Sequence, residues 1–190
     1  MIWVDLDHTL IWTWEPLIST PMMSSLFGLP ISTPPTDRRY HKLRRVIIGD
    51  GYALSCAREN ALHLLRALRN LGELKMLTLA TRPYAEAMNS TFGFGFTPEI
   101  IVAREDYQKA VRGEAPTRID SAGVLVENIP YPKCYESERD LREKLALLGI
   151  ERSRVVFVPP FVGLKQDSFQ WRRTLDDVRA KLPSYTPKEA

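Results

Sequence analysis

The chain has 190 residues, an apolar fraction of 44% and a formal net charge of +3. These values are typical of an ordinary globular protein with one core, and they exclude disordered and fibrous classes. So small a charge does not by itself indicate nucleic-acid binding. The two cysteines, Cys56 and Cys134, are too few for a disulfide framework. No apolar run reaches membrane-spanning length and no basic leader precedes the first strand, so we expect a cytoplasmic protein.

The predicted elements begin with a short buried strand over residues 2–4, followed at once by Asp5 and Asp7. In a parallel α/β sheet, this end of a strand faces the crevice in which ligands bind. Two carboxylates so close repel each other unless a cation or a shared proton compensates, and Mg²⁺ prefers such oxygen ligands. A carboxylate beside Mg²⁺ can also attack phosphorus to form an aspartyl-phosphate.

Residues 11 to about 45 are the least regular part of the chain, because closely spaced prolines prevent a long helix. We predict a flap over the carboxyl edge of the sheet. Trp12 and Trp14 either fill the core beneath a surface loop or belong to a lid that shapes substrate entry. A cluster of basic residues lies at the end of this stretch and comprises Arg38, Arg39, His41, Lys42, Arg44 and Arg45. It is either a solvent-exposed face or a surface that attracts an anionic substrate.

A hairpin and a helix come next. Asp50-Gly51 lies between the apolar runs 45–48 and 52–56, which is a hairpin signal. Leucines at helical spacing then predict a helix from Glu59 or Asn60 to Gly72.

The remaining chain alternates strands with helices, which predicts one α/β domain with a central parallel sheet over residues 1–182. Further strands are expected at 74–79, 99–103, 123–126 and 154–158. Helices are expected after Arg82, over Leu141–Leu148, and from Trp171 to Leu182. The flap and hairpin (11–57) form an insert, no large cap domain is expected, and residues 183–190 read as a frayed tail.

Polar side chains also follow two of the later strands. Thr78, Leu79, Thr81 and Arg82 lie where a buried strand leads into a helix N-terminus, a place where hydroxyls and backbone N–H groups suit a phosphate. Thr81 is in addition a candidate N-cap. Glu127-Asn128 ends another buried strand, so the predicted magnesium ligands are Asp5, Asp7, Asn128 and Glu127.

These segments resemble the motifs of the haloacid dehalogenase superfamily of phosphohydrolases. Asp5-Leu6-Asp7-His8-Thr9-Leu10 is similar to its first motif, which implies that Asp5 is the nucleophile and Asp7 the general acid/base. Residues 78–87 resemble the second motif of the RNA polymerase II C-terminal-domain phosphatase branch, which makes Thr78 the phosphate-binding hydroxyl, with Thr81 as the competing assignment. Glu127-Asn128 stands where that branch has Asp-Asn.

The resemblance also implies a lysine that offsets the negative charge of the aspartates and the phosphate. Lys109, which follows the third strand, is our choice, and it competes with Arg104, Arg112 and Arg118. Asp167 is predicted to cap the last helix, with a metal role as the alternative. Cys56 and Cys134 have no paired histidine at a recognisable spacing and receive no catalytic role.

The sequence therefore predicts a Mg²⁺-dependent phosphomonoester hydrolase. The resemblance suggests phosphoserine or phosphothreonine in a protein as its substrate. A nucleotide or nucleic-acid end is the alternative, with a base stacked on Trp12 or Trp14. A non-catalytic binding module that keeps the fold is the second alternative.

Overall fold

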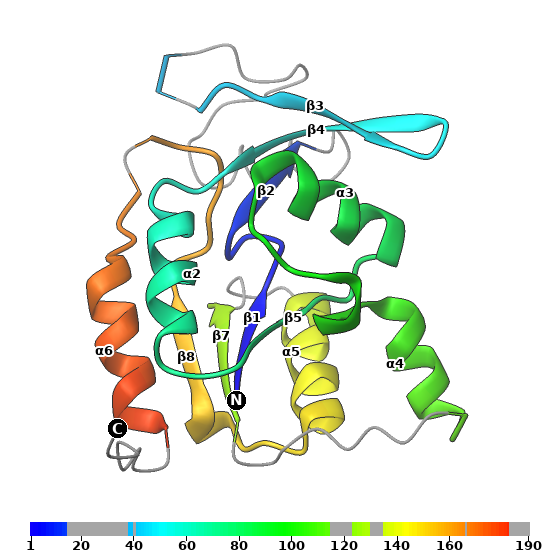
Figure 1. The fold of residues 1–190 in the computed structure, drawn as a ribbon, viewed down its shortest axis with the longest axis vertical. Coiled ribbons are helices and arrows are strands. Elements are labelled where there is room, and N and C mark those ends of the chain that lie inside the picture. Colours follow the sequence, from blue (N-terminus) through cyan, green and yellow to red (C-terminus); the bar gives the residue numbers. More distant parts are fainter. Residues whose placement is uncertain (15–37, 40, 115–122, 130–134, 166, 183–190) are drawn as a thin grey trace.

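The computed structural model describes residues 1–14, 38–39, 41–114, 123–129, 135–165 and 167–182 (Figure 1). Most of the predicted flap, Arg118, Cys134 and the predicted tail lie outside these residues.

The centre of the molecule is a five-stranded sheet in the order β6-β5-β1-β7-β8, and every neighbouring pair is parallel. This confirms the predicted fold class. Its strands are β1 (Ile2–Asp5), β5 (Leu74–Leu77), β6 (Ile101–Val102), β7 (Val124–Asn128) and β8 (Val155–Val158). The strand β5 is shorter than predicted because it stops before Thr78, and β6 is shorter because a 3₁₀-helix, η1 (Pro98–Ile100), takes the place of its first residues.

Helices connect these strands and cover both faces of the sheet (Figure 1). None of the helices in the described part of the chain is long and apolar enough to cross a membrane. The helices are α2 (Ala61–Arg69), α3 (Arg82–Phe92), α4 (Arg104–Val111), α5 (Tyr135–Leu148) and α6 (Trp171–Lys181), with a second 3₁₀-helix, η2 (Arg152–Arg154), before β8.

The two faces of the sheet belong to two separate hydrophobic cores. Ile2 and Val4 pack into the core that contains the buried residues of α2, α3 and α6. Trp3 and Leu125 pack into the other core, together with Leu141 and Leu148 of α5. Successive side chains of a strand point to opposite faces, so residues two apart share a face. In β1, Asp5 therefore points to the same face as Trp3, toward α5.

A second sheet of three antiparallel strands, in the order β2-β4-β3, lies across the end of the central sheet where β1 leads into β2 (Figure 1). Its strands are β2 (Ile11–Trp14), β3 (Arg44–Ile48) and β4 (Gly51–Ala57). The β3–β4 hairpin was predicted. The prediction of irregular chain was wrong for Ile11–Trp14, which pairs with β4, because Ile11 and Trp12 are buried and the run is too short to show a period.

Gly163 packs against Trp12 of this second sheet. Its φ is +79°, and a Cβ atom there would lie 2.2 Å from Cε3 of the Trp12 ring. We expect Gly163→Ala to lower the free energy of unfolding by about 3 kcal/mol, because it adds a steric clash to a strained backbone. Urea denaturation measures this loss.

Gly93→Ala is the matched control for this prediction. Gly93 has a φ of +68°, but a Cβ atom there meets no atom within 4 Å. It should lose only about 1 kcal/mol, from backbone strain alone. Equal losses at the two positions would contradict the role of the Trp12 contact.

Candidate active site

Asp5 is the last residue of β1, at the centre of the sheet, and the neighbouring strands bring the other polar strand ends to it. Asp5 pairs in register with Leu77, so Thr78 follows at the same edge. Val4 pairs with Val126, which puts Glu127 and Asn128 beyond it at that edge as well.

The Asp5 carboxylate is buried, with 2% of its surface exposed, and both of its oxygens have partners. Lys144 Nζ lies 2.6 Å from Oδ1. The Thr9 hydroxyl donates to Oδ2 at 3.1 Å. A buried carboxylate with a charged donor on one oxygen and a hydroxyl on the other is fixed in orientation.

Lys144 lies on α5 and joins two carboxylates in the interior. Its ammonium group also donates to Glu127 Oε2 at 2.7 Å, and all three side chains are less than 8% exposed. Burial alone would lower the pKa of Lys144, but the negative charges of Asp5 and Glu127 outweigh burial and raise it. The lysine is therefore a fixed positive charge beside Asp5.

Glu127 is bound by this lysine. Burial, and after it the negative charge of Asp5, raise the pKa of Glu127 to about 8, while Lys144 acts in the opposite direction. Glu127 was predicted as a magnesium ligand, and the structure shows that its Oε2 atom accepts a hydrogen bond from Lys144. The longer side chain reaches across to the lysine on α5.

The structure does not bring the predicted lysine to Asp5. Lys109 is exposed on α4. Arg104 donates from Nε to the Leu79 carbonyl at 2.7 Å, and Arg112 is exposed beside Glu114. The fourth candidate, Arg118, lies outside the described residues.

Lys144 was missed because the prediction looked before β7, whereas this lysine comes from the helix that follows β7. A signal was present in the sequence. Lys144 comes three residues after Leu141 and four before Leu148, so it lies on the buried stripe of its helix. A lysine on such a stripe needs a buried partner of opposite charge.

Asp7 receives a hydrogen bond from α3. The Tyr84 hydroxyl donates to Asp7 Oδ1 at 2.7 Å and also lies 2.6 Å from Thr13 Oγ1 on β2. Tyr84 lies within residues 78–87, and no local pattern in the sequence places its hydroxyl beside Asp7.

The predicted phosphate-binding residues separate into two groups. Thr78 is buried at the end of β5, and its Oγ1 accepts a hydrogen bond from the Ala80 amide at 3.1 Å, which closes a tight turn after the strand. Leu79 belongs to this turn, and Thr81 is the N-cap residue of α3. Arg82 points elsewhere: its guanidinium binds the carbonyls of Pro98 and Ile101 and the carboxylate of Asp106.

The oxygens around Asn128 suit a magnesium ion. The Asn128 Nδ2 group donates to the Ile129 carbonyl at 3.1 Å, so its Oδ1 faces the Thr9 hydroxyl at 3.5 Å, the same hydroxyl that contacts Asp5. The described residues contain no group of three or more His, Cys, Asp or Glu side chains that could hold a metal. Besides the Asp5 carboxylate, the Asn128 amide oxygen and a main-chain oxygen are suitable ligands for a magnesium ion here.

Arg58 holds the loop after β1. It is buried, donates from Nη1 to the Thr9 carbonyl at 2.9 Å, and forms an ion pair with Asp167 at 2.6 Å. Asp167 was predicted to cap the last helix. That prediction was wrong, because α6 begins at Trp171 and its N-cap residue is Gln170.

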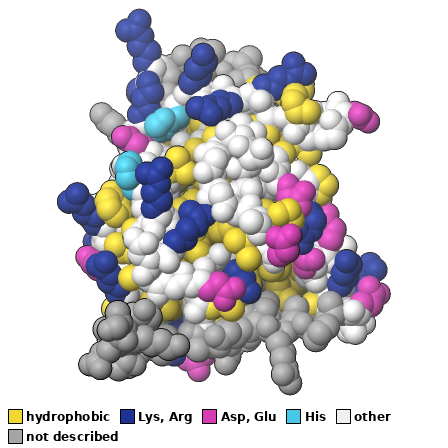
Figure 2. Space-filling model, viewed as in Figure 1, with side chains coloured by type: hydrophobic (Ala, Val, Ile, Leu, Met, Phe, Trp, Pro, Cys, Tyr) yellow, Lys and Arg dark blue, Asp and Glu magenta, His cyan; other side chains and the backbone are white. Residues whose placement is uncertain are grey.

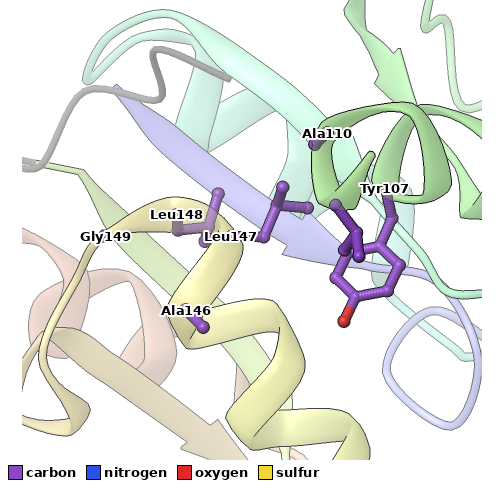
Figure 3. Close-up of a pocket in the computed structure, with 7 residues that line it drawn as sticks. Tyr107, Ala110, Ala146, Leu147, Leu148 and Gly149 are labelled. Atoms are coloured by element: carbon purple, nitrogen blue, oxygen red, sulfur yellow. The ribbon is translucent and has the colours of Figure 1, made fainter. Parts of the chain in front are cut away.

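Two further features lie apart from this chemistry. Burial raises the pKa of the Cys56 thiol to about 12. A hollow of about 320 Å³ lies between α4 and α5 (Figure 3). Its lining is largely apolar and consists of Tyr107, Ala110, Val111, Ala146, Leu147, Leu148 and Gly149.

Comparison with known proteins gives matches among solved structures alone. No protein-family model matches the chain, and no curated protein does. The chain is similar to the RNA polymerase II CTD phosphatase Fcp1.

Two Fcp1 structures show this similarity. For fission yeast Fcp1-R271A bound to beryllium fluoride, identity is 15% and the TM-score 0.48, over 95% of this chain and 50% of the other. For a second Fcp1 structure, identity is 14% and the TM-score 0.46, over 95% and 49%. The chain thus spans about half the length of these phosphatases.

A third similar structure is the Legionella pneumophila effector Ceg4 with an N-terminal yeast Hog1p sequence. Identity is 12% and the TM-score 0.45, over 96% of this chain and 95% of the other. Because all three TM-scores are below 0.5, the assignment of function rests on the geometry of the site.

Lys144→Met tests the charge balance of this site. It leaves Asp5 and Glu127 buried without their counter-charge, so we expect the free energy of unfolding to fall by about 3–5 kcal/mol. Urea denaturation with a chelator present measures this loss. In the double variant with Glu127→Gln, the loss should be smaller than the sum of the two single losses.

Lys109→Met is the matched control for this prediction, because Lys109 is exposed. Its effect should stay within about 0.5 kcal/mol. Similar losses for the two lysine variants would contradict the buried pairing of Lys144 with the carboxylates.

Proposed function

We propose that this chain is a magnesium-dependent phosphomonoesterase of the haloacid dehalogenase type, with Asp5 as its nucleophile. The observation that carries the proposal is the buried Asp5 carboxylate, held by Lys144 on one oxygen and by Thr9 on the other. A carboxylate with a fixed orientation and a neighbouring positive charge is suited to approach an anionic phosphoryl group.

The first step joins Asp5 to phosphorus and breaks the bond to the ester oxygen. Asp7 gives a proton to that leaving oxygen. In the second step, Asp7 takes a proton from the water that attacks the aspartyl-phosphate, which releases inorganic phosphate and restores Asp5. The half-buried position of Asp7 and its contact with Tyr84 support this role.

The proposed donors to the phosphoryl group come from the turn after β5 and from α5. The Thr78 Oγ1 atom already accepts from the Ala80 amide, so its own proton remains for an acceptor such as a phosphoryl oxygen. Lys144 takes the charge-offsetting role that was predicted for Lys109. Asp5, the Asp7 main-chain carbonyl and Asn128 would hold Mg²⁺, which would supply positive charge to offset that of the phosphoryl group.

A phosphorylated serine or threonine in a protein is the substrate class that we propose. The nucleic-acid alternative loses one of its supports, because Trp12 is fully buried with Cys56 and Phe161 and has no face for a base to stack on. Trp14 is half-buried in the same cluster. Lys and Arg side chains are prominent over the end of the molecule that carries β3 and β4, where they can attract any anionic substrate (Figure 2).

Asp5→Asn tests the mechanism. The amide cannot act as the nucleophile, so Mg²⁺-dependent hydrolysis of p-nitrophenyl phosphate should fall by more than about 1000-fold. During turnover of the wild-type protein, acid quenching should trap a hydroxylamine-sensitive phosphoryl group on the peptide that contains Asp5.

Asp50→Asn is the control, because Asp50 is exposed in the turn of the β3–β4 hairpin. It should keep its activity. Undiminished hydrolysis by Asp5→Asn would refute the mechanism. Calorimetry that finds no Mg²⁺ binding to the wild-type protein would favour the non-catalytic module.

A substrate panel tests the substrate class. Release of phosphate from phosphoserine and phosphothreonine peptides should exceed release from nucleotides and from 3′- or 5′-phosphorylated oligonucleotides by at least about 10-fold in kcat/KM. A preference for the oligonucleotides or the nucleotides would overturn the substrate class and leave the phosphatase mechanism in place.

A further inference from the structure

Three hydroxyl groups connect Asp7 to the second sheet. Tyr84 Oη donates to Asp7 Oδ1 at 2.7 Å. Thr13 Oγ1 lies 2.6 Å from Tyr84 Oη and 2.7 Å from Ser55 Oγ. Thr13 and Ser55 are directly opposed residues of β2 and β4, so the series runs from a cross-strand pair, through α3, to Asp7.

The directions of these hydrogen bonds depend on one another. Each hydroxyl carries a single proton. When Tyr84 donates its proton to Asp7, Thr13 must donate to Tyr84, and Ser55 must donate to Thr13. The middle hydroxyl, Thr13, is therefore the group on which the series depends, because its removal takes a partner from both neighbours.

The hydroxyl of the series that lies farthest from Asp7 belongs to Ser55. Ser55 is fully buried in β4. The turn between Asp7 and β2 is short, with a bridge between Asp7 and Ile11 and a hydrogen bond from the His8 amide to the Ile11 carbonyl at 2.8 Å. The second sheet can thus fix the position of the Asp7 side chain, which follows the rigid strand β1 by only two residues.

We propose that Thr13 is a positioning residue for the reaction, acting through Tyr84 to hold the Asp7 carboxyl group at the leaving oxygen. This role rests on the proposed function, in which Asp7 is the general acid/base. Because every hydroxyl can both donate and accept, the series keeps its contact with Oδ1 while the proton moves to and from Asp7.

Substrates with different leaving groups can reveal the positioning role of Thr13. An alkoxide is a poor leaving group and depends on proton transfer, whereas p-nitrophenolate leaves with little need of an acid. A displaced Asp7 must therefore harm alkyl phosphates more than p-nitrophenyl phosphate. The ratio kcat/KM isolates formation of the aspartyl-phosphate, in which the leaving group departs.

The test compares Thr13→Val, which removes the hydroxyl at nearly constant shape, with Thr13→Ser, which keeps it. For Thr13→Val we expect kcat/KM to fall about 10-fold or more on an alkyl phosphate such as glycerol phosphate, and about 2-fold on p-nitrophenyl phosphate. Thr13→Ser should recover most of the loss on the alkyl phosphate. Tyr52→Phe, at an exposed tyrosine of the hairpin, is the control for Tyr84→Phe and should have no effect.

The possible results distinguish the positioning role of Thr13 from the proposed phosphatase function. Equal losses on both substrates, or a Thr13→Ser variant as impaired as Thr13→Val, would refute the positioning role while the phosphatase function stands. A wild-type protein that hydrolyses neither ester would refute the proposed function and this role together. If Thr13→Val does not fold, Tyr84→Phe breaks the same series next to Asp7 and should show the same selective loss.

Discussion

The arrangement of the site depends on one buried ammonium group, that of Lys144, between the carboxylates of Asp5 and Glu127. Two carboxylates removed from water at the ends of adjacent strands repel each other, and each loses its hydration. The lysine offsets this cost and links α5 to the sheet.

Side chains alternate between the two faces of a strand, and this alternation sets the direction of the candidate catalytic residues as well as that of the core residues. Trp3 and Leu125 point toward α5 and pack in its core. Asp5 and Glu127 come two residues later in the same strands, so they point to that face as well, and Lys144 meets them from the buried stripe of the helix. A slip of one residue in β1 would turn Asp5 away from α5, so the register of the sheet and the geometry of the site cannot be separated.

The second sheet and its surroundings hold the loop that follows β1. Arg58, directly after β4, binds the Thr9 carbonyl and the Asp167 carboxylate, and so connects this loop to the segment that follows β8. Thr9 in turn contacts both Asp5 and Asn128. Arg58 therefore holds a loop whose Thr9 hydroxyl contacts groups on either side of Asp5.

The α/β class, the β3–β4 hairpin and the position of Asp5 after a buried strand could all be predicted from the sequence, since they follow from local periodicity and turn chemistry. The tertiary structure decided what each charge meets. It replaced Lys109 by Lys144, which lies 139 residues from Asp5 along the chain, gave Glu127 a lysine partner, turned Arg82 toward Asp106 and buried Trp12. Local patterns specify the period and the burial of a segment, whereas the partner of a buried charge depends on which distant element packs against it.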